Sequence, residues 1–259
     1  MADGGARPGR RSARFSEVRR HTEVDSPNRV AADLARAGAP DGVVVVAAHQ
    51  TAGRGRRGRS WLAPPGASLL VSVLLRPPDA PAGGAPALTT VACSLAASDA
   101  VDQVAGFRPA LRWPNDLYAG GRKLGGVLAE VVDGGAVVVG LGVNLRWPAG
   151  VPEPLAGIPV TAEEAAGRPV DRDELLAAFL DRLEARDGAL ASDAGRPQIL
   201  ADYRDRCETL GRPVRVTLPG GRTRVGVAAG VDGSGHLVLD SDGTATVLAV
   251  GDVEHVATT

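Results

Sequence analysis

The sequence has few of the residues that build metal centres and disulfide frameworks. It contains two cysteines and four histidines in 259 residues. Cys93 and Cys207 lie far apart, and no Cys-x-x-Cys or clustered His/Cys pattern offers the closely spaced ligands of a zinc site. A structural zinc fold and a disulfide-stapled secreted domain are therefore disfavoured, and a reducing cytoplasm is the expected location.

Long apolar segments and an excess of charge are also missing. No apolar run approaches the roughly 20 residues that span a bilayer, so we expect no membrane association. Residues 1–14 are rich in Gly, Arg and Ala without an apolar core, which predicts a disordered tail and not a signal peptide. The formal net charge is -1, so no nucleic-acid-binding surface field is expected.

What the chain does contain is a loop that alternates glycine with arginine, at residues 50–61 (QTAGRGRRGRSW). Glycine lets the backbone approach a ligand closely, and the arginines offer planar forks of donors for carboxylate or phosphate. Because the cations repel one another, we predict that the loop is mobile when empty and orders on an anion. The alternative is a solvated basic loop or a nucleic-acid-binding segment.

Three further motifs follow the loop, each beside a strand-like run: RWPND at residues 112–116, KLGGVLAE at 123–130 and GLGVNL at 140–145. Lys123 precedes two glycines, where missing side chains would let a ligand lie against the strand. Trp61 and Trp113 are large apolar surfaces in a chain with 3% aromatics, suited to cover a base or to pack in the core. Asp116 is suited either to hold magnesium or to pair with an arginine.

Hydrophobic periodicity predicts an α+β domain. We expect helices over 27–37, from Pro86 to about Val104, after Asp171 (whose spacing to Glu174 resembles a capping box) and around Ile199. Strands are expected at 43–48, 67–75, 110–113, 117–119, 123–132 and 136–144, the last four joined by turns short enough for antiparallel hairpins. Five short strands after Gly211 predict a small β-barrel.

These motifs, in their order and spacing, resemble the biotin protein ligase family over nearly the whole chain, from about Phe15 to Val256. The resemblance implies a reaction in which biotin and MgATP give biotinyl-5'-AMP, whose acyl group passes to a lysine of the biotin carboxyl carrier domain of an acyl-CoA carboxylase. It also implies a class II synthetase-like mixed sheet with helices packed on one face, followed by an SH3-like barrel. The expected divisions are a tail at 1–14, a catalytic domain at 15–209 and a barrel at 210–259.

Carried over position by position, the resemblance implies roles for individual residues. Lys123 and Arg56 would be catalytic, and Asp116 would lie near the metal. The biotin contacts would be Ser26, Asn28, Gln50, Arg54, Gly55, Arg56 and Lys123, and the nucleotide contacts Trp61, Asn115 and Asn144.

Two positions depart from the family pattern: Pro27 stands where many members have threonine, and Arg112 where many have lysine. Too few residues precede Phe15 for the winged helix-turn-helix of bifunctional members, so the ligase-only form is expected, as a monomer or a homodimer. The alternatives are a lipoate or octanoate ligase, a binding module that holds biotin or its adenylate without transfer, and a Gly/Arg nucleic-acid binder.

Overall fold

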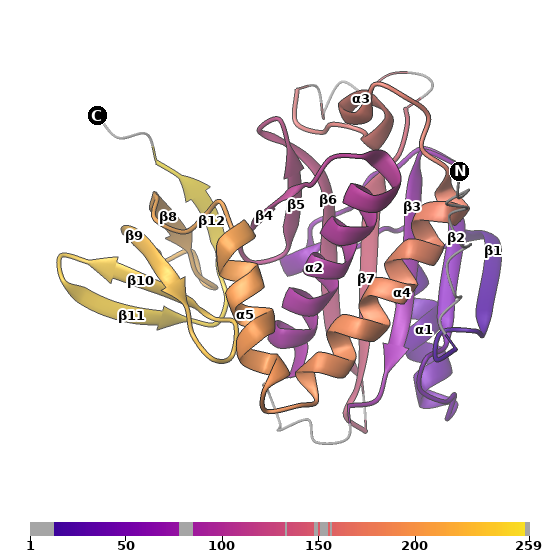
Figure 1. Cartoon of the computed structure of the whole chain (residues 1–259), viewed down its shortest axis with the longest axis horizontal. Coiled ribbons are helices and arrows are strands. Elements are labelled where there is room, and N and C mark those ends of the chain that lie inside the picture. The colour runs from indigo at the N-terminus through magenta and orange to yellow at the C-terminus, as the bar shows by residue number, and fades with distance from the viewer. Residues whose placement is uncertain are drawn as a thin grey trace, which may run out of the picture.

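Two β-sheets of different size form the framework of the chain in the computed structural model (Figure 1). The structure describes residues 13–77, 85–132, 134–147, 150, 155 and 157–256. The predicted tail at 1–14 thus lies outside the described residues except for Ala13 and Arg14. The Arg14 guanidinium is held in ion pairs by Asp41 and Asp187.

The larger sheet has seven strands in the order β1-β2-β3-β7-β6-β5-β4. β1 pairs with β2 in parallel, and every other pair is antiparallel. The hairpins predicted from the short turns are therefore confirmed. The strands are β1 Val18–Val24, β2 Val44–Gln50, β3 Ser68–Leu75, β4 Ala110–Arg112, β5 Asp116–Ala119, β6 Arg122–Val132 and β7 Ala136–Asn144.

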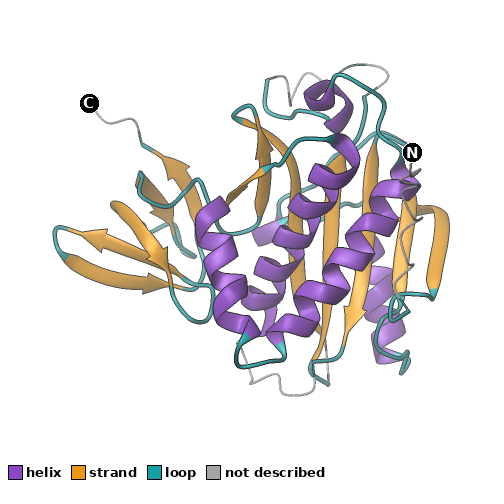
Figure 2. Cartoon of the chain, in the orientation of Figure 1, coloured by secondary structure: helices purple, strands orange, loops and turns teal. Residues whose placement is uncertain are grey.

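Helices cover both faces of this sheet, but unequally (Figure 2). The long helices α2 (Ala85–Ala105) and α4 (Arg172–Leu190) pack on one face, with α5 (Gly195–Arg206) beside them. The prediction of helices on one face holds for these three, whereas α1 (Pro27–Arg36) packs against the opposite face. Successive residues of β2 show the reason, since Val44 and Val46 join the α2/α4 core while Val45 joins the α1 core.

The helix boundaries follow local chemistry. Pro27 occupies the first turn of α1, where its missing N–H costs nothing. The Asp171 carboxylate accepts a 2.8 Å hydrogen bond from the Glu174 N–H at the start of α4, so the expected cap is confirmed. The sequence patterns did not reveal β1, an edge strand of mostly polar residues, or the short helix α3 (Ala162–Ala166).

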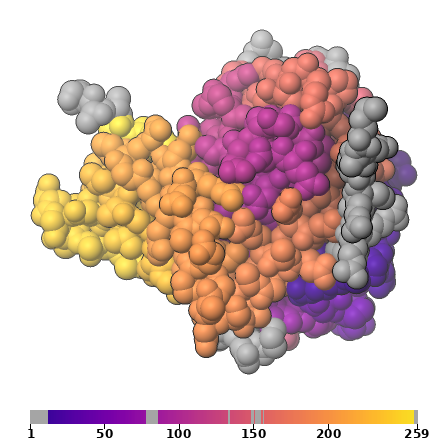
Figure 3. All heavy atoms as spheres, viewed as in Figure 1, coloured from indigo at the N-terminus to yellow at the C-terminus, as the bar shows by residue number. Residues whose placement is uncertain are grey.

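The five strands predicted after Gly211 are confirmed and form a small antiparallel sheet in the order β11-β10-β9-β8-β12. Their bounds are β8 Pro213–Thr217, β9 Thr223–Val231, β10 Leu237–Ser241, β11 Thr244–Leu248 and β12 Asp252–His255. We call residues 213–255 the small domain. In Figure 3 it forms a lobe beside the larger body, next to α5. No helix in the described part of the chain combines the length and apolar character needed to cross a membrane.

Trp113 joins the two domains. Its side chain is buried, and its indole N–H donates a 3.1 Å hydrogen bond to the Gly235 carbonyl of the small domain. Its backbone N–H donates to the Thr209 hydroxyl. The sequence left two roles open for Trp113, covering a base or packing in the core, and the structure supports packing in the core.

Candidate active site

The candidate site lies on the face of the large sheet that carries α1. On β3, β6 and β7 alternate residues point to this face, and the glycines and the serine among them leave space near the middle of the strands. The strand register aligns them in rows. Ser72, Gly140 and Leu128 form one row, and Leu70, Gly142, Gly126 and Asp116 form the next.

A β-bulge places Lys123 on this face. Leu117 pairs with Gly125 but Tyr118 pairs with Lys123, so β6 has one extra residue at this point. Strict alternation from Gly126 would have turned Lys123 toward the α2/α4 core, where Leu124 now lies instead. The bulge therefore delivers a cationic side chain to the site.

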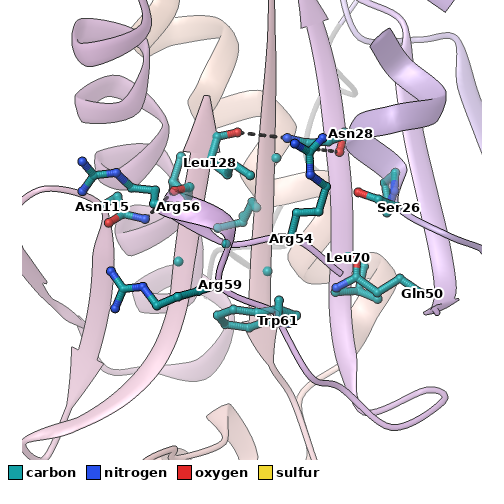
Figure 4. Close-up of a pocket in the computed structure, with 18 of the residues that line it drawn as sticks. Ser26, Asn28, Gln50, Arg54, Arg56, Arg59, Trp61, Leu70, Asn115 and Leu128 are labelled. Atoms are coloured by element: carbon teal, nitrogen blue, oxygen red, sulfur yellow. Dashed lines mark hydrogen bonds between the residues drawn. The ribbon is translucent and has the colours of Figure 1, made fainter. Parts of the chain in front are cut away.

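These rows form the floor of a pocket of about 780 Å³, open mouth included, shown in Figure 4. The pocket brings together all but Asn144 of the residues to which the family resemblance gives a role, although they come from segments far apart in the chain. They are Ser26, Asn28, Gln50, Arg54, Gly55, Arg56, Trp61, Asn115, Asp116 and Lys123.

A buried polar network closes one end of the pocket around Asn28. Its Oδ1 accepts a 2.6 Å hydrogen bond from the Ser72 hydroxyl, and its Nδ2 donates to the Leu128 carbonyl and to the Glu130 carboxylate. The other Glu130 oxygen lies 3.3 Å from the Arg54 guanidinium, which extends toward Asn28 in Figure 4. Helix α1, the sheet and the basic loop (residues 50–61) therefore share one network.

The basic loop folds back on itself at the mouth of the pocket. Arg54 and Ser60 form an antiparallel bridge around a short turn, Arg56–Gly58, and the Trp61 N–H donates to the Gly53 carbonyl. Gly53 is required here, because a Cβ would lie 2.3 Å from the Trp61 carbonyl oxygen. This fold-back places the Trp61 ring over the floor.

Glycines make the room for that ring. A Cβ on Gly142 would lie 2.9 Å from Trp61 Cε2, and one on Gly126 would lie 3.6 Å from Trp61 Cζ3. Gly126 and Gly142 pair directly across β6 and β7. That a ligand lies against the glycines beside Lys123 stays a prediction, and at Gly126 the ligand would share the space with Trp61.

Lys123 occupies the centre of the site. Its Nζ lies 2.7 Å from Asp116 Oδ1 and 5.6 Å from the centroid of the Trp61 ring. Its backbone exchanges hydrogen bonds with Ile158 and Val160, which fixes its place on the sheet. Among the 29 lysines and arginines of the sequence it is the only lysine. A compact ammonium is retained here in a chain that otherwise uses guanidinium groups.

Asn144 lies in an adjoining hollow that Trp61 and Lys123 also line. It is buried, and its amide donates long hydrogen bonds of 3.4 and 3.3 Å to the Lys123 and Val160 carbonyls. Asn115 lies in the main pocket and donates 2.6 Å to the Val127 carbonyl. Lys123 and Trp61 thus line both the main pocket, which the Asn28 network closes, and the hollow at Asn144.

Electrostatics favour an anionic ligand. Burial lowers the pKa of Arg56, against the opposing effect of Asp252 and Asp116, because its charge is poorly solvated in the pocket wall. A carboxylate or phosphate would relieve that cost. Among the described residues, no three His, Cys, Asp or Glu side chains converge to hold a metal ion. Asp116 is a single carboxylate, which fits a magnesium ion held mainly by the phosphates of its nucleotide.

The two departures from the family pattern have local explanations. Pro27 starts α1 and also lines the pocket. Arg112 stacks 3.6 Å above the Tyr118 ring and pairs with Glu208, so its charge is held at the domain junction.

Three residues that hold the side chains of the site in place were not identified from the sequence. Ser72 is a buried hydroxyl inside an apolar strand, and that contrast is a usable signal. Glu130 ends the motif that begins at Lys123, but nothing in the pattern pairs it with Asn28. Asp252, in the small domain, contacts the basic loop and has no sequence signal at all.

Comparison with known proteins agrees with this geometry. Residues 22–144 match the model of the biotin/lipoate A/B protein ligase family, and residues 209–256 match that of the biotin protein ligase C-terminal domain. The chain is 41% identical to the biotin:acetyl-CoA-carboxylase ligase of Mycobacterium tuberculosis over 83% of this chain and 80% of that protein. It is 36% identical to the corresponding ligase of Paracoccus denitrificans, over 89% and 97% of the two chains.

A solved structure shows the same fold. The biotin protein ligase of Aquifex aeolicus in complex with biotin and ATP aligns with a TM-score of 0.80 at 25% identity, covering 93% of this chain and 98% of that one. The extent of these matches, over both domains, shows that the chain belongs to the biotin protein ligase family.

Proposed function

We propose that this protein is a biotin:acetyl-CoA-carboxylase ligase that activates biotin with ATP and transfers it to a lysine of a biotin carboxyl carrier domain. The observation that carries the proposal is that Lys123 lines both the main pocket, which contains the polar network at Asn28, and the adjoining hollow at Asn144. A site built to join two ligands needs a cation where their reacting groups meet.

Biotin is assigned to the end of the pocket near Asn28. Its ureido group needs a few buried polar partners, which Ser26, Asn28 and Gln50 offer, while the ring system and alkyl chain need apolar walls such as Leu70 and Leu128. Rows of the sheet are about 7 Å apart, at two residues of strand rise each. A ligand that starts in the Ser72 row therefore brings its carboxylate toward Lys123 and Arg56.

The nucleotide is assigned to the other end. Trp61 provides a face for stacking, and Asn115 and Asn144 provide amide groups for the adenine or ribose. Asp116 would hold magnesium, which when bound neutralises phosphate charge. Asp116 now pairs with Lys123, so the same carboxylate also orients that ammonium.

The first step joins the two anions. A carboxylate oxygen of biotin attacks the α-phosphorus of ATP, the bond to the leaving pyrophosphate breaks, and biotinyl-5'-AMP forms. Lys123 and Arg56 offset the repulsion between carboxylate and phosphate and stabilise the charge that develops on the transferred phosphoryl group. In the second step a lysine amine of the carrier domain attacks the acyl carbon, and AMP leaves.

The direct test is pyrophosphate release from MgATP by the purified protein, with biotin, lipoate or octanoate supplied in parallel and no acceptor present. We expect release with biotin alone. Release with lipoate or octanoate would move the activity to the neighbouring branch of the family, and no release with any acid would support a binding module.

A further inference from the structure

Three arginines of the basic loop tie it to the small domain. Arg56 Nη1 donates 3.3 Å to the Gly251 carbonyl. Arg57 Nη1 lies 3.0 Å from the Thr217 carbonyl and 2.8 Å from Asp252 Oδ2, and its Nη2 donates to the Leu218 carbonyl. Arg59 pairs with the other oxygen of Asp252.

The small domain is shaped to accept this loop. Asp252 pairs with Thr217 across β12 and β8, so a carboxylate and a carbonyl lie side by side where the fork of Arg57 meets them. Gly251 packs closely on the same strand pair, since a Cβ there would lie 2.4 Å from Val216 Cγ1. The acceptors for the loop are thus fixed by the pairing of two strands.

Arg57 has a strained backbone, which indicates that these contacts hold it in place. Its φ is 57°, in the left-handed region that residues with a Cβ rarely adopt. Such a conformation persists where the surroundings over-determine it. The turn that it makes sends the Arg57 side chain to the small domain, while the neighbouring Arg56 reaches the Gly251 carbonyl and also lines the pocket.

We propose that Asp252 is a positioning residue of the ligase, which anchors Arg57 and Arg59 on the small domain and thereby keeps Arg56 turned toward the bound adenylate. Asp252 is the carboxylate that both arginines share, so its removal leaves them to repel each other and Arg56. The proposal rests on the proposed function and deepens it, because it gives the small domain a part in retaining the reaction intermediate.

The test compares Asp252→Asn with Asp252→Glu, which restores the charge, and with Glu254→Gln, an exposed carboxylate two residues along the same strand. Enzyme is loaded with biotin and MgATP without acceptor, and escape of biotinyl-5'-AMP is followed after rapid gel filtration. Asp252→Asn removes the charge-assisted hydrogen bond between Asp252 and the Arg57 guanidinium. We expect biotinyl-5'-AMP to escape roughly tenfold faster from this variant. Asp252→Glu should recover most of the retention, and Glu254→Gln should match the unmodified protein.

A second readout uses the ligand-free protein. Trypsin cleavage at Arg54 to Arg59, mapped by mass spectrometry, should accelerate about as much in Asp252→Asn while cleavage of the small domain stays constant. In the double variant with Arg57→Ala, the two effects on escape should be less than additive, because both changes break the Arg57–Asp252 contact although Arg57→Ala also removes the contacts with Thr217 and Leu218.

The two assays distinguish failure of the proposed function from failure of the positioning role of Asp252. If the unmodified protein forms no biotinyl-5'-AMP, the proposed function fails, whereas the cleavage assay still tests the anchor. If the unmodified protein forms and holds the adenylate, and Asp252→Asn holds it equally well with unchanged loop cleavage, the positioning role of Asp252 is overturned.

Discussion

Replacing Gly140 with alanine is expected to abolish most of the affinity for biotin. A Cβ at this position would lie 2.0 Å from Asn28 Oδ1 and 2.9 Å from its Cγ, so the Asn28 side chain has to move. Asn28 is 6% exposed and hydrogen-bonds Ser72, Leu128 and Glu130. Movement therefore breaks up to three hydrogen bonds in the wall of the pocket, one of them buried and two part-buried.

The magnitude follows from those bonds. At about 1 kcal/mol each, with a further cost for polar groups left buried, the change amounts to about 2–4 kcal/mol. If that cost falls on the bound state, the Kd for biotin rises about 30- to 1000-fold. Isothermal titration of biotin in the absence of ATP measures it directly.

Gly188→Ala is the matched control. Gly188 lies within α4, and a Cβ there would meet no heavy atom within 4 Å. Alanine should stabilise the helix by about 0.5–1 kcal/mol and leave biotin binding unchanged. If the Kd of Gly140→Ala for biotin lies within threefold of that of the control, the Asn28 network does not determine biotin affinity.

Three other changes have defined outcomes. Arg56→Ala should leave folding intact but release adenylate about tenfold faster, as charge stabilisation is lost; unchanged adenylate retention would contradict its role. Gly142→Ala should displace Trp61, whose Cε2 would lie 2.9 Å from the new Cβ, and raise the KM for ATP together with a shift in tryptophan fluorescence. Burial alone would raise the pKa of Asp99, but hydrogen bonds from Arg186 and Arg206 outweigh it and the pKa is lowered. The ionised Asp99 carboxylate therefore stabilises the fold above about pH 4, and this stabilisation is lost as the pH falls through the lowered pKa. Asp99→Asn should therefore reduce the decrease of Tm at acid pH.

Most of the framework was predictable because its elements have strong local signals. The apolar runs of β2, β3 and β7 fit only buried strands, and the Asp171 cap and Pro27 mark helix starts. β1 lacks such a signal, because an edge strand exposes alternate residues and this one is mostly polar. The position of α1 on the opposite face was not predictable from its own sequence, since an amphipathic helix fits either face.

The site was predictable in composition but not in arrangement. The glycine-arginine loop and the motif at Lys123 pointed to residues that the structure places together in one pocket. The contact of Glu130 with Asn28 joins residues about a hundred positions apart, and that of Asp252 with Arg57 nearly two hundred. Such pairs depend on strand register and domain packing, which no local pattern encodes. The bulge that turns Lys123 into the site belongs to the same class.

In the proposed mechanism, Lys123 promotes the reaction between the biotin carboxylate and the α-phosphorus of ATP. The most direct measurement is single-turnover formation of biotinyl-5'-AMP from biotin and MgATP by Lys123→Ala, with Lys123→Arg as a variant that keeps the charge. The Lys123–Asp116 pair is partly exposed, so its loss should cost the fold no more than about 1 kcal/mol. We predict adenylate formation slowed at least about 100-fold in Lys123→Ala, less in Lys123→Arg, with a Tm close to that of the unmodified protein. Adenylate formation by Lys123→Ala at a near-normal rate would contradict the account.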